Sequence, residues 1–263
     1  MLRLATGAYA LPGAPSDIVA ARLGGGLLTC VSLAERMGLP LLRTPRGPHI
    51  AVPSDRRVVR GSALPPGTHV HWDAALVDGR RRRVSSEGAG SDAPWSRLAV
   101  PLDLALLHAI ACLPFREVVA LWDAAVNRGL VEVVDLDARR PARSGRLRFD
   151  AVRRAVDGRS QSIPETFLRL ALRRAGLRVE PQPLVEGVGH VDLLVEDLVV
   201  VEADGYAYHQ DRRAFAEDRR RDRQVAMLGL RSLRYTYHDV VDRTELCVLE
   251  VAELVRRMRI TGR

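Results

Sequence analysis

The stretch GHVDLLVEDLVVVEADGYAYH, residues 189–209, decides the fold class of this chain. It holds two apolar runs, 193–195 and 198–201, separated by the acidic pair Glu196 and Asp197. Short apolar runs that are rich in valine and bounded by turn-forming residues predict strands. We therefore expect two neighbouring strands here, with acidic side chains close to their ends.

The segments around this stretch alternate between helical and strand-like patterns. The first helix has Ser162 as its N-cap, Pro164 in its first turn and Glu165 at its third position. The predicted elements are a helix, three strands, a helix, a strand and a closing helix, at 162–176, 177–185, 189–197, 198–206, 212–229, 230–238 and 244–258. This order predicts an α/β domain over 160–263, with a mixed sheet between helices.

Three acidic residues of this domain interrupt its apolar pattern. Asp192 begins an apolar strand, and Glu202 follows four apolar residues near the end of the next strand. Asp204 projects to the same strand face as Glu202. Carboxylates at the ends of adjacent strands repel one another unless a cation lies between them. We expect Asp192 and Glu202 to hold Mg²⁺ or Mn²⁺, which would activate a water and stabilise charge on a phosphate under attack.

The segment after these strands carries a histidine and two tyrosines. His209 can act as a general base, or can hydrogen-bond a leaving oxygen, near neutral pH. Gly205 permits the sharp turn that would fold His209 back over the strand ends. Tyr206 and Tyr208 can stack on bases or wedge into a duplex. The alternative for both tyrosines is ordinary packing.

Each acid also has a purely structural interpretation. Glu165 fits the acid of a capping box at the start of its helix. Asp192 and Asp204 fit the turn residues that commonly end strands. The occurrence of these three acids together with Glu202, which lies inside the apolar stretch VVVEAD, favours a catalytic cluster.

Together these residues resemble the PD-(D/E)XK nuclease superfamily, in particular its branch related to the very-short-patch-repair endonucleases. In that superfamily an acid on a helix precedes an Asp at one strand and an (Asp/Glu)-x-Lys element on the next. The resemblance maps these acids onto Glu165, Asp192 and Glu202, with Asp204 in place of the Lys. The repair-endonuclease branch also lacks the Lys and has a turn of the type (His/Asp)-Gly-x-x-x-His, which DGYAYH matches with Asp204 and His209. The resemblance implies a restriction-endonuclease-like α-β-β-β-α-β core with these five residues in its catalytic site.

The helix that follows is similar to the same branch, in which an Asp and an Arg on this helix support the site. The matching positions in EDRRRD are Asp218, Arg221 and Asp222. Several arginines crowd this helix, and we expect some of them to neutralise DNA phosphates. These are Arg219, Arg220, Arg221 and Arg223. Arg221 has the alternative of being held by Asp218 and Asp222.

Residues 1–136 predict a smaller α+β domain, followed by a polar linker with a short helix over 137–159. The segments LATGAYALPG, LLTCVSLAERMGLP and PLDLALLHAIACLPFREVVALWDAAVNRGL resemble the AbiEi-type antitoxin family. That family has an N-terminal winged helix-turn-helix. We expect this element to be missing here, because residue 1 falls where the wing would begin. The resemblance implies no catalytic residues in this region.

The cysteine and histidine spacing of this region matches no metal motif. Cys30, Cys112 and Cys247 lie far apart in apolar surroundings and form no C-x-x-C pair. A structural zinc site or a disulfide framework is therefore not expected, and buried reduced thiols are. His69 and His71 share one strand face and could bind a metal. With no third ligand nearby in the sequence, the favoured interpretation is a pair of exposed strand histidines.

The composition is that of a soluble globular protein, with 47% hydrophobic and 27% charged residues. A net charge of +8 favours an anionic partner such as nucleic acid, although the arginine bias of a GC-rich genome gives the same excess. All 40 basic residues are Arg, which excludes a P-loop and a pyridoxal phosphate site because both need Lys. No apolar run reaches the roughly 18 residues of a membrane span. We expect a cytoplasmic protein with no membrane partner.

The sequence therefore predicts a Mg²⁺- or Mn²⁺-dependent DNA endonuclease, a hydrolase that acts in DNA repair or in defence against phage and mobile elements. The competing interpretation is a non-enzymatic DNA-binding regulator of antitoxin type with a degenerate nuclease fold. A third is a protein that acts through contacts with a toxin or with a second copy of itself.

Overall fold

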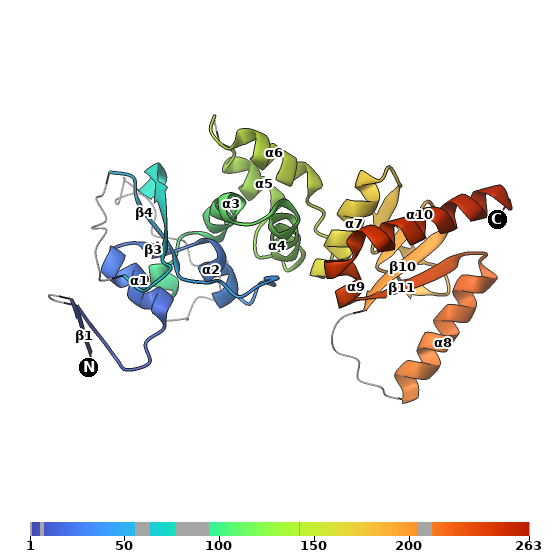
Figure 1. Ribbon diagram of the computed structural model, residues 1–263, viewed down its shortest axis with the longest axis horizontal. Helices are drawn as coiled ribbons and strands as arrows, with labels where there is room; N and C mark the ends of the chain where they lie inside the picture. Colours follow the sequence, from blue (N-terminus) through green and yellow to red (C-terminus); the bar gives the residue numbers. More distant parts are fainter. Residues whose placement is uncertain are drawn as a thin grey trace. The chain divides into compact units, whose positions relative to one another are not determined.

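The computed structural model describes residues 2–5, 8–55, 64–76, 95–141, 143–204 and 212–262. The chain divides into two compact units, Met1–Val156 and Asp157–Arg263 (Figure 1). Each unit combines helices with a sheet that contains both parallel and antiparallel pairs. The chain is therefore of the mixed α/β class that the sequence predicts.

The first unit is built around a three-stranded sheet in the order β3-β4-β5, with a separate hairpin of β1 and β2. β3 runs antiparallel to β4, and β5 runs parallel to it, so that Ala51 lies opposite His71. The strands are β1 (Leu2–Ala5), β2 (Ala8–Ala10), β3 (Leu27–Leu28), β4 (His49–Pro53) and β5 (His69–Asp73). The helices are α1 (Ser16–Gly24), α2 (Cys30–Arg36), α3 (Leu102–Cys112), α4 (Phe115–Asn127), α5 (Val133–Ala138) and α6 (Arg146–Ala155), with 3₁₀ turns η1 (Ala74–Leu76) and η2 (Ser96–Leu98).

The predicted linker over 137–159 needs correction, because most of it folds as part of the first unit. α6 packs on α3 and α4. Its residues Phe149 and Val152 are fully buried, and the ring of Phe149 meets that of Trp122 edge to face at 5.7 Å between centroids. A segment with many Arg, Pro and Gly residues looks polar in the sequence. Two apolar residues on one helical face are nevertheless enough to seat it on a core.

The second unit contains a four-stranded sheet in the order β11-β10-β9-β6, in which β10 and β11 are parallel and the other pairs are antiparallel. The strands are β6 (Val179–Pro181), β7 (Leu184–Val185), β8 (Gly189–His190), β9 (Leu193–Val195), β10 (Val199–Asp204) and β11 (Arg231–Thr236). The helices are α7 (Ile163–Arg174), α8 (Arg212–Met227), α9 (Tyr237–Asp242) and α10 (Thr244–Ile260). The order of elements follows the prediction, except that a small β7–β8 hairpin is inserted before β9 and the short helix α9 is inserted before α10. α9 includes the last two residues of the segment predicted as the final strand, Tyr237 and His238.

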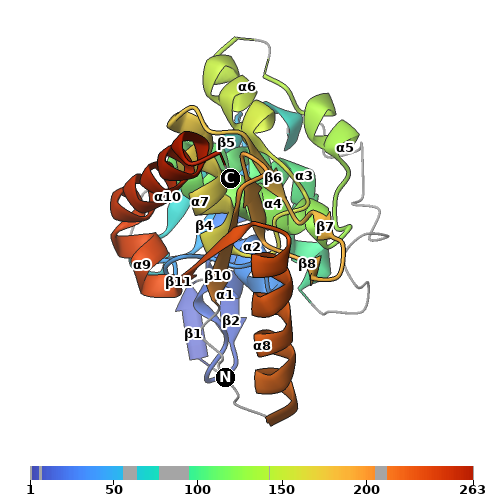
Figure 2. The same cartoon turned by 90° about the vertical axis from the view of Figure 1, so that its right-hand side faces the viewer.

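Helices cover both faces of this sheet. α7 and α10 contact β10 on one face, and α8 lies on the opposite face (Figures 1 and 2). Side chains alternate along β10, so Val200 packs against Val225 of α8, whereas Val199 and Val201 face the other layer. Glu202 has the same parity as Val200. The alternation of side chains along β10 therefore points the Glu202 side chain towards α8.

A tight turn fixes the register of β9 and β10. Glu196 and Asp197 both have positive φ, 55° and 56°, as the two central residues of a twisted hairpin turn require. Glu196 accepts hydrogen bonds from the backbone N–H of Arg178, at 2.7 Å, and from Arg259 Nη2, at 2.5 Å. With the turn held in this way, Val195 lies opposite Val199. Asp192, at the other end of the pair, is thereby placed beside the end of β10.

Asp157 lies at the start of the second unit among several arginines. Arg159 Nε is 2.9 Å and Arg173 Nη2 is 3.3 Å from its carboxylate, and Arg169 lies fully buried nearby in the same unit. Burial raises the pKa of Asp157. The hydrogen bond and charge of Arg159 and the charge of Arg169 outweigh this effect and lower the pKa to about 2.

An Asp157→Asn variant is expected to lose about 2 kcal/mol of unfolding free energy at pH 7. A carboxyl pKa lowered by folding stabilises the native state above the unfolded value, about pH 4, and this contribution is lost as the pH falls towards 2. The difference between variant and wild type should therefore shrink below about pH 4. Urea denaturation at several pH values measures it, and a difference that stays constant in acid contradicts the assignment.

Candidate functional site

Asp192 lies just before β9, at the end of β10, and its carboxylate is held by two donors. Oδ2 accepts the backbone N–H of Ala203 at 2.8 Å, and Oδ1 accepts the Gln182 side-chain amide at 3.3 Å. The β9–β10 register places Asp192 there, because Leu193 is paired with Val201. An acid that the sequence singles out as misplaced in an apolar strand thus bridges the strand ends.

Glu165 reaches the same place from the first turn of α7. Ser162 Oγ accepts the backbone N–H of Glu165 at 3.3 Å, which caps the helix. Glu165 Oε2 accepts the backbone N–H of Gln161 at 3.0 Å and the Gln182 amide at 2.9 Å. The side chain is therefore both part of the helix start and part of the acidic cluster. It is also 95% buried, with 5% of its surface exposed.

Gln182, which the sequence analysis does not single out, joins these two acids. One amide nitrogen donates to both Glu165 and Asp192. The backbone N–H of Gln182 also donates to the carbonyl of Asp192 at 2.9 Å. Its φ of +52° is unusual for a residue other than glycine and turns the chain between Pro181 and Pro183. A single glutamine flanked by prolines was the only signal in the sequence.

Glu202 has guanidinium groups against both of its oxygens. Arg221 Nη2 of α8 lies 3.0 Å from Oε1, and Arg234 Nε of β11 lies 2.9 Å from Oε2. Arg234 faces Glu202 because the two residues are register partners across the parallel pair of β10 and β11. The structure thus joins Glu165 to Asp192 and places Glu202 on an arginine pair. The Glu202 side chain is 14% exposed.

Arg234 forms ion pairs with two acids of α8. Its Nη1 lies 2.6 Å from Asp218 and its Nη2 lies 3.0 Å from Asp222. The hydrogen bond from Arg234 lowers the pKa of Asp218. The alternative in which Asp218 and Asp222 hold Arg221 is therefore replaced by one in which they hold Arg234. Arg221 donates instead to Glu202 and to the carbonyl of His190, while its buried Nε meets no acceptor among the described residues.

The remaining predicted arginines lie exposed on α8. Arg220 is paired with Glu217 at 2.6 Å and donates to the carbonyl of Gly187. Arg219 lies 3.7 Å from Asp222. Arg223 has no ion-pair partner within the part of the chain that the structure describes. This helix therefore presents cationic side chains to solvent, as a phosphate-binding surface requires.

Three predicted site residues lie outside the described part of the chain: Tyr206, Tyr208 and His209. Asp204 is the last residue of β10, and only its backbone is described. Its position puts it two residues beyond Glu202 on the same strand. Roles for these four residues therefore stay predictions.

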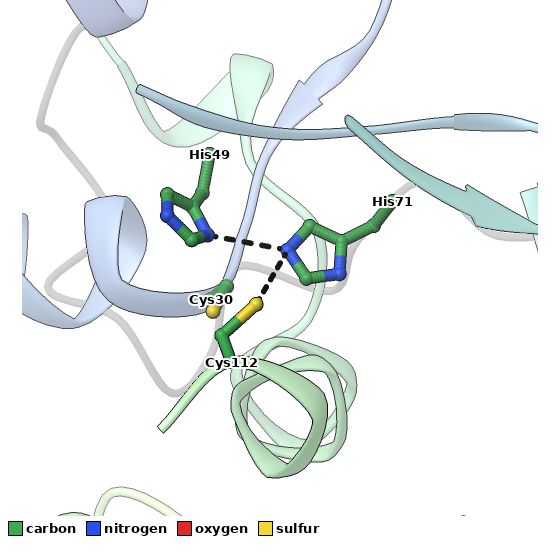
Figure 3. Close-up of side chains that lie close together, drawn as sticks. All are labelled: Cys30, His49, His71 and Cys112. Carbon is green, nitrogen blue, oxygen red and sulfur yellow. Dashed lines mark hydrogen bonds between the residues drawn. The ribbon is translucent and has the colours of Figure 1, made fainter. Parts of the chain in front are cut away.

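A second group of side chains, in the first unit, could hold a metal ion. It consists of Cys30, His49, His71 and Cys112, whose ligand atoms all lie within 4.8 Å of one another (Figure 3). The prediction of an exposed histidine pair was wrong for His71, which is 8% exposed and lies beside both cysteines, whereas His69 is exposed. The cysteines form no disulfide, and Cys30 and Cys247 are buried as predicted while Cys112 is half-buried. The hydrogen bond from Cys30 lowers the pKa of the Cys112 thiol.

Among the described helices, none has both the length and the apolar character that crossing a membrane requires. No family model, curated protein or solved structure matches the chain.

Proposed function

We propose that the second unit is a metal-dependent endonuclease that hydrolyses the phosphodiester bonds of DNA. The observation that carries this proposal is the convergence of Glu165 and Asp192 on one amide nitrogen, that of Gln182, beside the end of β10. These two acids come from separate elements, α7 and the start of β9. Like charges do not converge in a fold without a compensating group or a function.

The architecture gives a second line of support. A restriction-endonuclease-like core needs the order α-β-β-β-α-β with a mixed sheet. The chain provides α7, β6, β9, β10, α8 and β11 in this order, with a parallel pair formed by the last two strands. Glu165 in α7, Asp192 just before β9 and Glu202 in β10 support the mapping that the PD-(D/E)XK resemblance implies.

The donor chemistry of the cluster fits Mg²⁺ or Mn²⁺. Glu165 and Asp192 offer hard carboxylate oxygens, which these ions prefer. The side-chain amide of Gln182 already donates to both carboxylates, and its N–H dipole points its positive end at them. Asp192 is therefore the strongest candidate ligand, with Glu165 in support. A divalent ion bound there would supply an activated water and charge stabilisation for the phosphate under attack.

The other residues have roles that follow from their positions. Exposed arginines of α8, Arg219, Arg220 and Arg223, neutralise DNA phosphates. Arg221 and Arg234 hold Glu202 and thereby fix the end of β10, where Asp192 is anchored through Ala203. His209 serves as the base or the partner of the leaving oxygen, on the strength of the DGYAYH resemblance.

One observation favours the competing function, a DNA-binding regulator with a degenerate nuclease fold. Glu202 is already neutralised by two arginines, so a metal would have to share or replace these partners. A buried acid with two guanidinium partners serves structure as well as it serves catalysis. The two functions therefore differ in whether the Glu165–Asp192 cluster binds a divalent ion.

Incubation of the purified protein with supercoiled plasmid separates the two. The endonuclease is expected to convert the plasmid to nicked or linear DNA with Mg²⁺ or Mn²⁺ and to leave it intact with EDTA. Salt-sensitive DNA binding without cleavage under either metal would contradict the endonuclease and support the regulator. Gel electrophoresis of the plasmid and a filter-binding titration over several salt concentrations provide the two measurements.

A further inference from the structure

Four potential ligands converge in the first unit from four separate elements. Cys30 begins α2, His49 begins β4, His71 is central in β5 and Cys112 ends α3. Figure 3 shows the two imidazole rings and the two sulfurs pointing towards a common centre. No such grouping follows from the sequence spacing, because His71 is 22 residues from His49 and 41 from Cys112.

Two distances within this cluster match those of a tetrahedral zinc site. His49 Nδ1 lies 3.3 Å from His71 Nε2, and Cys112 Sγ lies 3.7 Å from the same nitrogen. With Zn–N bonds of about 2.0–2.1 Å and Zn–S bonds of about 2.3 Å, a tetrahedron has N···N edges of about 3.3 Å and N···S edges of about 3.6 Å. Two separations between ligand atoms thus already agree with those that one shared ion imposes, and all four ligand atoms lie within 4.8 Å of one another.

We propose that Cys30, His49, His71 and Cys112 form a structural zinc site. Two thiolates and two imidazoles are the donor set that zinc prefers, whereas Mg²⁺ prefers oxygen ligands. Four protein ligands fill a tetrahedron and leave no open position for a substrate. The role is therefore structural rather than catalytic. This site goes beyond the proposed nuclease function and does not depend on it.

The surroundings of the ligands support this assignment. His108 stacks on His71, with ring centroids 4.7 Å apart and planes at 17°. Its Nδ1 lies 2.8 Å from Thr29 Oγ1, and its Nε2 lies 2.9 Å from Asp73. Thr29 precedes Cys30, and Asp73 follows His71 on the same strand. His108 therefore connects the two segments that carry these ligands, as the residues around metal ligands commonly do.

The backbone at Cys30 is a further sign of constraint. Its φ is +51°, in the left-handed region that residues other than glycine seldom occupy. Such conformations are strained and persist where surrounding interactions demand them. Cys30 is also buried, with 1% of its surface exposed. A bond from its sulfur to a metal provides the compensating interaction.

Binding requires the thiolate form of both cysteines and the neutral form of both histidines. Zn²⁺ therefore displaces one proton from each thiol to solvent and accepts lone pairs from His49 Nδ1 and His71 Nε2. No electron is transferred. The product joins α2, β4, β5 and α3 at one point, so that removal of zinc should loosen the whole first unit.

Metal analysis of the full-length protein, purified under reducing conditions with zinc present, tests the proposal. The expected content is about one zinc per chain after desalting. His71→Ala and Cys112→Ser should reduce this content to near zero. The matched control is His69→Ala, since His69 stacks on His49 and meets His71 edge to face but is exposed and lies outside the ligand set. Zinc retained in both ligand variants, or lost equally in the control, overturns the proposal.

A cobalt titration keeps the test informative if the ligand variants fail to fold. Wild-type protein stripped by a chelator under reducing conditions is titrated with Co²⁺ alone. A tetrahedral site with two thiolates should give intense visible bands and a near-ultraviolet thiolate band that saturate at about one equivalent and disappear when Zn²⁺ is added. No such bands from protein with both thiols reduced, or a Cys30–Cys112 disulfide in place of metal, overturns the proposal.

An Asp192→Ala variant distinguishes this proposal from the nuclease. It should bind zinc as wild type does, because Asp192 belongs to the second unit. Loss of plasmid cleavage with the zinc content unchanged is the result that both proposals predict for this variant. If wild-type protein with about one zinc per chain fails to cleave plasmid, only the nuclease proposal fails.

Discussion

An Asp192→Ala variant is expected to lose plasmid nicking by about a thousandfold, the rate equivalent of ~4 kcal/mol of transition-state stabilisation. Asp192 is the acid that Gln182 and the backbone of Ala203 hold at the end of β10. Its loss removes the most favourable oxygen ligand for a divalent ion and leaves Glu165 alone on the Gln182 amide. Initial rates of conversion of supercoiled to nicked plasmid at saturating Mg²⁺ measure the effect.

Asp197→Asn is the matched control for this experiment, since asparagine removes the charge but tolerates the positive φ of this turn position. Asp197 is also an acid next to β9, but 62% of its side chain is exposed and its ion-pair partner is Arg178. It should keep nearly the full cleavage rate. Purification of both variants by the same procedure also exposes a contaminating nuclease, because that activity would survive in Asp192→Ala. Equal nicking by the two variants would remove the basis for the proposed function.

Much of the second unit could be predicted from the sequence, because its local signals agree with its tertiary contacts. The valine run of β10 gives a strand buried on both faces, and Ser162 caps α7 as its spacing to Glu165 predicts. Turn chemistry before Val199 sets the β9–β10 hairpin. The restriction-endonuclease-like core stays a prediction, although the order and pairing of the strands agree with it.

The first unit was harder to predict, because its helices are held by distant contacts. α6 depends on Phe149 and Val152 reaching the core, and a segment with many arginines hides that amphipathic pattern. α1 (Ser16–Gly24) has no Ser, Thr, Asp or Asn side chain acting as an N-cap, since Pro15 precedes it, and it carries only a short apolar face. The ends of these two helices are therefore not marked by clear signals in the sequence.

Residues brought together from distant elements mark the limit of sequence reasoning about the sites. Glu165 and Asp192 were predictable as acids in unusual places, whereas Gln182 joins them only through a left-handed turn. Cys112 and His71 share no local motif, since their elements meet only when α3 packs beside the sheet. The spacing of residues in the sequence can predict a site whose residues share one strand or helix. Both sites here combine residues from several elements, so their spacing does not reveal them.

Replacing Arg234 by methionine is expected to lower the unfolding free energy of the second unit by about 3 kcal/mol. Arg234 is the one described cation that contacts three acids of the sheet and of α8, at 2.9 Å from Glu202, 2.6 Å from Asp218 and 3.0 Å from Asp222. Methionine keeps much of the aliphatic stem but leaves these carboxylates close together without their shared partner. The expected loss is below that of a fully buried pair because 27% of the Arg234 side chain is exposed.

The tryptophans of the chain, Trp72, Trp95 and Trp122, all lie in the first unit, which lets the two units be followed separately. Urea denaturation followed by circular dichroism should show an earlier transition in Arg234→Met, while the tryptophan fluorescence transition stays in place. Arg231→Met, an exposed position on the same strand, should shift neither. Because Arg234 lowers the pKa of Asp218, the stability it provides is present above about pH 4 and lost in acid, so the deficit of the variant should shrink as the pH falls. A pH-independent deficit, or one seen equally in Arg231→Met, would mean that packing of the arginine stem and not its charge holds β11 to α8.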